Sequence, residues 1–139
     1  MNGILVDSNV LLDVLTEDPD WFKWSADALK VIADSNEMFI NPVIYSEVSV
    51  RFQTIEEIES AIPDFVFGRR AIPWEAAFLA GKCFLKYRRA GGMRTSTLPD
   101  FFIGAHAAVE NLAILTRDTD HYRTYFPTVR LIAPASRHT

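Results

Sequence analysis

Short apolar runs alternate with amphipathic segments along the chain. The runs at 4–6, 38–40 and 112–115 are each followed by polar or helix-capping residues, and further apolar stretches lie at 70–72 and 129–132. These runs predict five strands. Capping residues and helical periodicity predict helices between them, at about 10–15, 20–33, 42–52, 55–62, 74–90 and 100–110. Strands that alternate with helices are typical of an α/β fold with a mainly parallel sheet.

The length and composition fit one globular domain. The chain has 139 residues, of which 49% are hydrophobic and 23% charged, so a mostly disordered chain is excluded. We expect a domain over 1–133 and a tail at 134–139. The apolar runs are too short for a membrane span and the first residues lack a secretory signal, so we expect a cytoplasmic protein. Cys83 is the only cysteine, which excludes an intrachain disulfide and a cysteine-built zinc site.

Charge is distributed unevenly along the chain. The net charge is −4, but residues 1–66 carry −10 and residues 67–139 carry +6. No acid occurs from 76 to 99, whereas this segment contains several cations: Lys82, Lys86, Arg88, Arg89 and Arg94. The segment is either a solvated helix face or a ridge that binds the phosphates of a nucleic acid.

Four acids occupy positions that suit a common site. Asp7 and Asp118 each follow a predicted strand, at the edge of a parallel sheet where ligands collect. Glu47 falls on the apolar stripe of its helix, and Asp100 begins a helix on the side that carries the small residue Gly104, which would allow a close helix contact. Each residue taken singly is also explained as a helix cap, a turn former or an edge position.

If these acids converge, a cation is needed to hold them together, because like charges at short range cannot all stay ionised alone. Oxygen ligands suit Mg²⁺ or Mn²⁺. Such an ion lowers the pKa of a bound water and neutralises charge on a phosphate, which is the chemistry of phosphodiester cleavage. The histidines His106, His121 and His138 lack the spacing of zinc ligands, and we expect His106 to face away from Asp100.

Three segments, 5–13 (LVDSNVLLD), 98–107 (LPDFFIGAHA) and 115–127 (LTRDTDHYRTYFP), resemble in order the motifs of PIN-domain ribonucleases, in particular VapC-type toxins. The resemblance implies a three-layer fold with a five-stranded, mainly parallel sheet flanked by helices. It implies an endoribonuclease that cleaves RNA as the toxin of a toxin–antitoxin pair. The enzyme would depend on Mg²⁺, with Mn²⁺ as the alternative ion. It also implies a homodimer that is inhibited by a VapB-type antitoxin.

Carried over by position, the resemblance assigns the catalytic acids as Asp7, Glu47, Asp100 and Asp118. Asp7, Asp100 and Asp118 would hold the metal, and Glu47 would position or deprotonate the attacking water. Asp120 could substitute for Asp118. Ser8 stands where the family often has Thr and could orient a carboxylate, and Thr116 could give hydroxyl support. The RNA backbone would contact the basic segment at Lys86, Arg88, Arg89 and Arg94.

Two aromatic groups admit two interpretations each. Trp21, Phe22 and Trp24 either pack in the core or form an antitoxin-binding groove, since aromatic residues dominate interface anchors. Tyr122, Tyr125 and Phe126 either stack on bases or seal the sheet edge.

Two other functions fit a domain of this size with acids at strand ends. A receiver-type phospho-acceptor domain would carry a lysine after a late strand, but the last lysine of this chain is Lys86. A non-catalytic module could use the acidic cleft to bind a basic peptide.

Overall fold

The computed structural model describes residues 3–94 and 98–135. Its strands form one sheet in the order β3-β2-β1-β4-β5, and all neighbouring strands are parallel. The strands are β1 (Ile4–Val6), β2 (Met38–Ile40), β3 (Phe67–Arg69), β4 (Ala113–Leu115) and β5 (Leu131–Ile132). The expected α/β fold with a parallel five-stranded sheet is confirmed. His138 and the predicted tail beyond Ala135 lie outside the described residues, as do residues 95–97 of the loop before the sixth helix.

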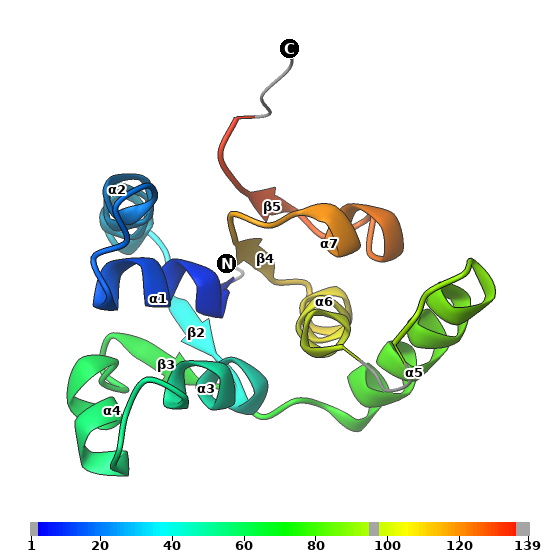
Figure 1. Ribbon diagram of the computed structural model, residues 1–139, viewed down its shortest axis with the longest axis horizontal. Coiled ribbons are helices and arrows are strands. Elements are labelled where there is room, and N and C mark those ends of the chain that lie inside the picture. Colours follow the sequence, from blue (N-terminus) through cyan, green and yellow to red (C-terminus); the bar gives the residue numbers. More distant parts are fainter. Residues whose placement is uncertain (1–2, 95–97, 136–139) are drawn as a thin grey trace.

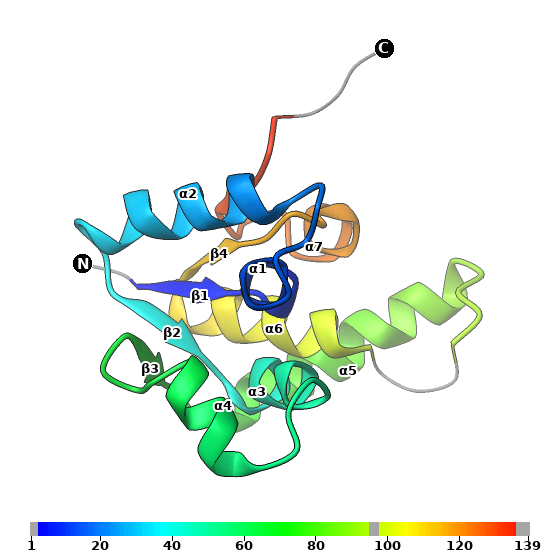
Figure 2. The same cartoon turned by 60° about the vertical axis from the view of Figure 1, so that its left-hand side comes forward.

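Helices cover both faces of the sheet. The helices are α1 (Ser8–Leu15), α2 (Phe22–Ala33), α3 (Pro42–Ser49), α4 (Ile55–Ala61), α5 (Trp74–Arg89), α6 (Pro99–Glu110) and α7 (Asp120–Tyr125). Figure 1 shows α1 and α2 on one side of the strands and α5, α6 and α7 on the other, which gives three layers. Helix α3 contacts both α1 and α6 beyond the carboxyl ends of the strands (Figure 2). In residues 3–94 and 98–135, no helix has the length and apolar character that a membrane span requires.

The central strands are completely covered because both faces of the sheet carry helices. Leu5, Val6, Ile114 and Leu115 have no exposed surface. Their continuous apolar sequences, without polar alternation, are what a parallel strand that is buried on both faces requires. From β1 the chain first adds strands on one side of the sheet (β2, β3) and then on the other side (β4, β5). A crevice is therefore expected between β1 and β4, at the carboxyl ends of these two strands.

The third strand is three residues earlier than the sequence pattern predicts. The prediction at 70–72 is wrong, because β3 pairs Phe67 with Met38 and Gly68 with Phe39. Phe67 is buried, and Gly68 leaves room for the Phe39 ring, since a Cβ at Gly68 would lie 2.7 Å from an atom of that ring. The last strand is also shorter than predicted, and α7 follows β4 where the sequence pattern gave no helix.

Asp13 interrupts the apolar stretch 10–15, which predicts that its side chain points away from the apolar face of the helix, but it is buried. Its Oδ2 accepts hydrogen bonds from Arg117 Nε and Ser25 Oγ, both at 2.8 Å, and its Oδ1 accepts one from Arg117 Nη2 at 3.0 Å. The expectation failed because a buried carboxylate is tolerated when a guanidinium and a hydroxyl satisfy both oxygens. This ion pair connects α1 and α2 to the segment that follows β4.

Gly104 allows α6 to approach the end of α7, as its sequence position suggested. A Cβ at Gly104 would lie 2.3 Å from Cδ2 of Phe126, a residue that is itself 3% exposed. A side chain at this position would have to displace a ring that is already enclosed in the core.

We therefore expect Gly104→Ala to lower the free energy of unfolding by about 1–3 kcal/mol, as overpacking of a buried contact does. The matched control is Gly81→Ala in α5, where nothing lies within 4 Å of the added Cβ. That control should stabilise the helix by roughly 0.5–1 kcal/mol. Urea unfolding of both variants measures the difference, and equal stabilities would contradict the close contact of α6 with Phe126.

Candidate active site

The acids singled out in the sequence line one cavity of about 340 Å³, namely Asp7, Glu47, Asp100 and Asp118. Asp7 directly follows β1 and Asp118 lies in the segment after β4, while α3 carries Glu47 and the first turn of α6 carries Asp100. The cavity therefore lies at the carboxyl ends of the two central strands, where the strand order reverses. Residues more than 100 positions apart in the chain meet here because β1 and β4 are neighbours in the sheet.

Asp7 is almost completely enclosed. Its side chain caps α1 by accepting a hydrogen bond from the Ser8 amide at 2.8 Å. Its second oxygen accepts hydrogen bonds from Thr116 Oγ1 at 2.9 Å and from the Tyr122 hydroxyl at 2.8 Å. Burial raises the pKa of Asp7 above its ordinary value and the charge of Asp100 adds to this, whereas the three hydrogen bonds act in the opposite direction.

Glu47 is connected to this group through Ser8. The Ser8 hydroxyl donates a hydrogen bond of 2.8 Å to Glu47 Oε1, so Ser8 does orient a carboxylate. The Glu47 side chain is half-buried. Partial burial raises the pKa of Glu47, the Ser8 hydrogen bond lowers it, and the charges of Asp7 and Asp100 raise it again. The carboxylates therefore repel one another within the cavity.

Two residues of the site were missed by reasoning from the sequence. His121 Nδ1 lies 2.6 Å from Asp100 Oδ2, and His121 lines the cavity. Tyr122 was expected to stack on bases or seal the sheet edge, but it is buried and its hydroxyl contacts Asp7. Burial, followed by the charge of Asp7, raises the pKa of Tyr122 well above its usual range, so the phenol keeps its proton and acts as a donor. Neither contact has a local sequence signal, because both partners come from distant segments.

The structure distinguishes residues that the sequence could not. Asp118 and Asp120 are both exposed, but only Asp118 lines the cavity. Thr116 is buried and supports both Asp7 and the turn at Asp118, since its hydroxyl oxygen accepts the Asp118 amide at 3.1 Å. His106 lies outside the cavity, as expected, and its ring nitrogens contact Asn41 at 3.0 Å and Glu110 at 2.7 Å.

The chemistry of the cavity suits a hard divalent cation. No lysine or arginine lines it in the described part of the chain, and the charge of Asp100 helps to raise the pKa of both Asp7 and Glu47. Carboxylate oxygens are the ligands that Mg²⁺ and Mn²⁺ prefer. Within residues 3–94 and 98–135, however, no three carboxylate, imidazole or thiol groups are already gathered tightly enough to form a metal cage.

The basic segment lies outside this cavity. Lys86, Arg88 and Arg89 are in the last turn of α5, and Arg94 follows the helix. All these side chains are exposed, and none of them lines the acidic cavity. Their assignment to RNA binding stays a prediction.

The family of the chain follows from comparison with known proteins. The family model described as "PIN domain" matches residues 4–127. The chain belongs to the PIN-domain family. The resemblance seen in the three sequence motifs is thus confirmed at the level of the family and the fold, and membership in this family excludes the receiver-type interpretation. None of the curated proteins compared with the chain matches it.

Solved structures share the PIN fold over nearly the whole chain. One is VapBC2 from Rickettsia felis bound to a fragment of its promoter DNA (17% identity, TM-score 0.71, 95% of this chain and 98% of that chain covered). Another is DNA-bound VapBC from Salmonella typhimurium (16% identity, TM-score 0.67, 96% of this chain and 98% of that chain covered). A third is a toxin–antitoxin complex from Klebsiella pneumoniae (20% identity, TM-score 0.64, 86% of this chain and 90% of that chain covered). At these identities the likeness shows the fold.

The raised pKa of Asp7 predicts the pH dependence of stability without a divalent ion. Because the folded state holds the proton more tightly than the unfolded state, the fold loses stability as the pH rises from the ordinary aspartate value of 3.8 through the raised value. We expect Asp7→Asn to have a higher Tm than the unsubstituted chain at neutral pH in EDTA, and a smaller difference near pH 4. Thermal unfolding across this range tests the prediction, and a pH-independent difference would contradict it.

Proposed function

We propose that this PIN domain is a divalent-metal-dependent endoribonuclease that acts as the toxin of a toxin–antitoxin pair. PIN domains are generally nucleases. The observation that carries the proposal is the single cavity shared by Asp7, Glu47, Asp100 and Asp118, without a lysine or arginine of the described residues to balance their charge. A cation is the group that such a set of carboxylates accommodates best.

In this proposal, Asp7, Asp100 and Asp118 hold Mg²⁺ or Mn²⁺. When bound, the ion lowers the pKa of a water molecule and neutralises the negative charge that grows on the phosphate. Thr116 and Tyr122 fix the direction of the Asp7 carboxylate by donating hydrogen bonds to it, and His121 fixes Asp100. These contacts hold the ligand oxygens in place before a substrate arrives, which lowers the reorganisation needed for the reaction.

In this proposal, Glu47 acts as the general base. Its raised pKa makes it a stronger proton acceptor than an ordinary glutamate, and the Ser8 hydroxyl holds one of its oxygens in position. In the proposed reaction, the other oxygen accepts a proton from the water that attacks the phosphate. The exposed basic segment at Lys86, Arg88, Arg89 and Arg94 binds phosphates of the RNA backbone away from the cleaved bond.

The proposed partners follow from the fold neighbours. Their printed descriptions name VapBC and toxin–antitoxin complexes. We infer that this chain likewise binds a VapB-type antitoxin, which blocks RNA cleavage, and that two copies of the chain form a homodimer. Purification with the product of the adjacent gene, followed by size measurement, tests both inferences.

Replacement of Asp7 should abolish the activity. We expect Asp7→Asn to reduce RNA cleavage by at least roughly 100-fold and to relieve growth arrest, because one metal ligand loses its charge. Cleavage of RNA with and without Mg²⁺ measures the effect, and circular dichroism verifies that the variant folds. The matched control is Asp120→Asn, which removes an acid from the exposed side of the same motif and should leave cleavage unchanged.

Two results would contradict the metal site. One is cleavage by Asp7→Asn at the unsubstituted rate, and the other is equal loss in Asp120→Asn. If calorimetry detects neither Mg²⁺ nor Mn²⁺ binding while a basic peptide binds, the cavity is a docking site rather than a catalytic centre.

The basic segment predicts a change in the salt dependence of RNA binding. We expect Arg89→Ala to weaken binding of single-stranded RNA about equally for all sequences, and to reduce the slope of log K against log salt concentration by about 0.7, which corresponds to one lost phosphate contact. The control Arg51→Ala removes an exposed arginine after α3. An unchanged slope in Arg89→Ala, or the same change in both variants, would contradict RNA binding at the basic segment.

A further inference from the structure

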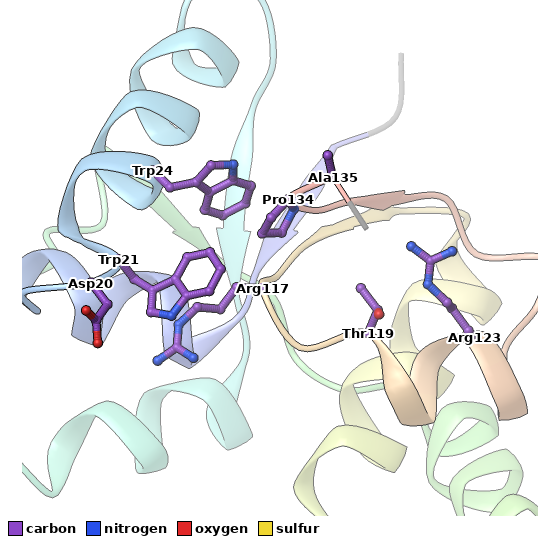
Figure 3. A pocket seen from close by; sticks show the side chains of 8 residues that line it. All are labelled: Asp20, Trp21, Trp24, Arg117, Thr119, Arg123, Pro134 and Ala135. Atoms are coloured by element: carbon purple, nitrogen blue, oxygen red, sulfur yellow. The ribbon is translucent and has the colours of Figure 1, made fainter. Parts of the chain in front are cut away.

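A second cavity, of about 860 Å³, lies between the beginning of α2 and the segment from Arg117 to Arg123 (Figure 3). Trp21 and Trp24, at the beginning of α2, form one side of it. Thr119 and Arg123 form the opposite side, and Pro134 lies beside the indole of Trp24. The cavity is thus bounded by flat aromatic surfaces on one side and by a hydroxyl and a cation on the other.

The two cavities share one wall, which is the segment from the end of β4 into α7. Asp118, His121 and Tyr122 line the acidic cavity. Arg117, Thr119 and Arg123, which alternate with them along the chain, line the second cavity. The two cavities therefore lie on either side of the short segment 117–123, which a polymer bound in the acidic cavity would cross to reach the second one.

The aromatic side of the second cavity is held in place. The rings of Trp21 and Trp24 are 6.2 Å apart and nearly perpendicular. The Arg117 guanidinium lies 5.3 Å from the centre of the Trp21 ring, and Asp13 fixes this guanidinium through two hydrogen bonds. Trp24 packs against the core, yet both indoles retain exposed surface. Trp24 thus packs against the core and also lines the cavity, whereas Trp21 packs against Trp24 and Arg117 and lines the same cavity.

Among the described residues that line the second cavity, Arg123 is a cation that no salt bridge holds and Asp20 is an acid. Asp13 neutralises Arg117, whereas Arg123 is exposed and forms no salt bridge within the described part of the chain. Asp20 also lines the cavity, but its carboxylate points away from the space between the indoles and Arg123 (Figure 3). Proteins bind single-stranded nucleic acids by stacking bases of any sequence on aromatic rings and by pairing arginines with the phosphates of the backbone.

We propose that this second cavity binds a nucleotide of single-stranded RNA that flanks the phosphate at the acidic cavity. Its base stacks on Trp21 or Trp24, and its phosphate pairs with Arg123. The proposal rests on the proposed ribonuclease function and adds the part of the molecule that holds the substrate strand. The shared wall and the polar groups of Arg117, Thr119 and Arg123 favour a nucleotide over the apolar anchor of a partner protein.

Tryptophan fluorescence tests this contact directly. The chain has three tryptophans, and Trp74 is 89% exposed on α5, so in Trp74→Phe all indole emission comes from the second cavity. This variant is mixed rapidly with a mixed-sequence 12-nucleotide single-stranded RNA in the presence of Mg²⁺, and emission is recorded before cleavage. The same samples are then assayed for cleaved product.

We expect the single strand to quench the emission, and a duplex of the same sequence to quench it far less because its bases are already stacked. Adding Arg123→Glu should weaken the RNA affinity roughly tenfold. The matched control, Arg51→Glu, makes the same charge change after α3 and should not weaken it comparably. Trp21→Phe, which keeps an aromatic plane, should retain more affinity than Trp21→Ala, and circular dichroism verifies that both fold.

The outcomes separate this proposal from the ribonuclease function. Cleavage without quenching, or equal affinities of the Arg123→Glu and Arg51→Glu variants, would overturn the nucleotide site and leave the proposed function intact. Neither cleavage nor quenching would overturn both. Variants that keep RNA affinity but no longer copurify with the adjacent gene product would assign the cavity to a protein partner and overturn the proposal.

Discussion

The site depends on the burial of one carboxylate, that of Asp7, at the carboxyl end of β1. This group is almost completely buried, and the protein itself supplies donors to it: the Ser8 amide, the Thr116 hydroxyl and the Tyr122 hydroxyl. These donors come from the start of α1, the end of β4 and α7, and their contacts with Asp7 fix these elements around one point. A buried charge is costly unless it is satisfied in this way. The arrangement of the remaining acids follows from this fixed point.

The hydrogen bonds around Asp7 do not fully offset its burial, and the site keeps an excess of negative charge. This excess is a property of the whole cavity, since Asp100 raises the pKa values of both Asp7 and Glu47. A fold selected for stability alone would place a lysine or arginine among these acids. Among the described residues, the nearby arginine of this segment, Arg117, is instead directed to Asp13 on the other side of the chain. Perturbed carboxylates gathered in a cleft are typical of functional sites.

The sequence was sufficient to predict the succession of strands and helices along the chain except for α7, and to single out the acids that line one cavity. Continuous apolar runs mark β1 and β4 reliably because both strands are buried on both faces. The edge strand β3 was misplaced because its pairing depends on Gly68 fitting against Phe39, a contact without a local pattern. For the same reason the contact of His121 with Asp100 was not predictable, and the carboxylate that Ser8 orients could not be named from the sequence. Asp13 was misjudged because its partner Arg117 is 104 positions away.

The capping of α1 by Asp7 has a consequence for the electric field in the cavity. Helices α1 and α6 both begin there, and the backbone amides at a helix start carry a partial positive charge. This contribution is built into the main chain and no side-chain substitution removes it. It offsets part of the repulsion among the carboxylates, and it persists when a cation has neutralised them. When a divalent cation is bound, this contribution further reduces the negative potential that an approaching phosphate meets, so the same backbone that tolerates the acids also helps to admit the phosphate.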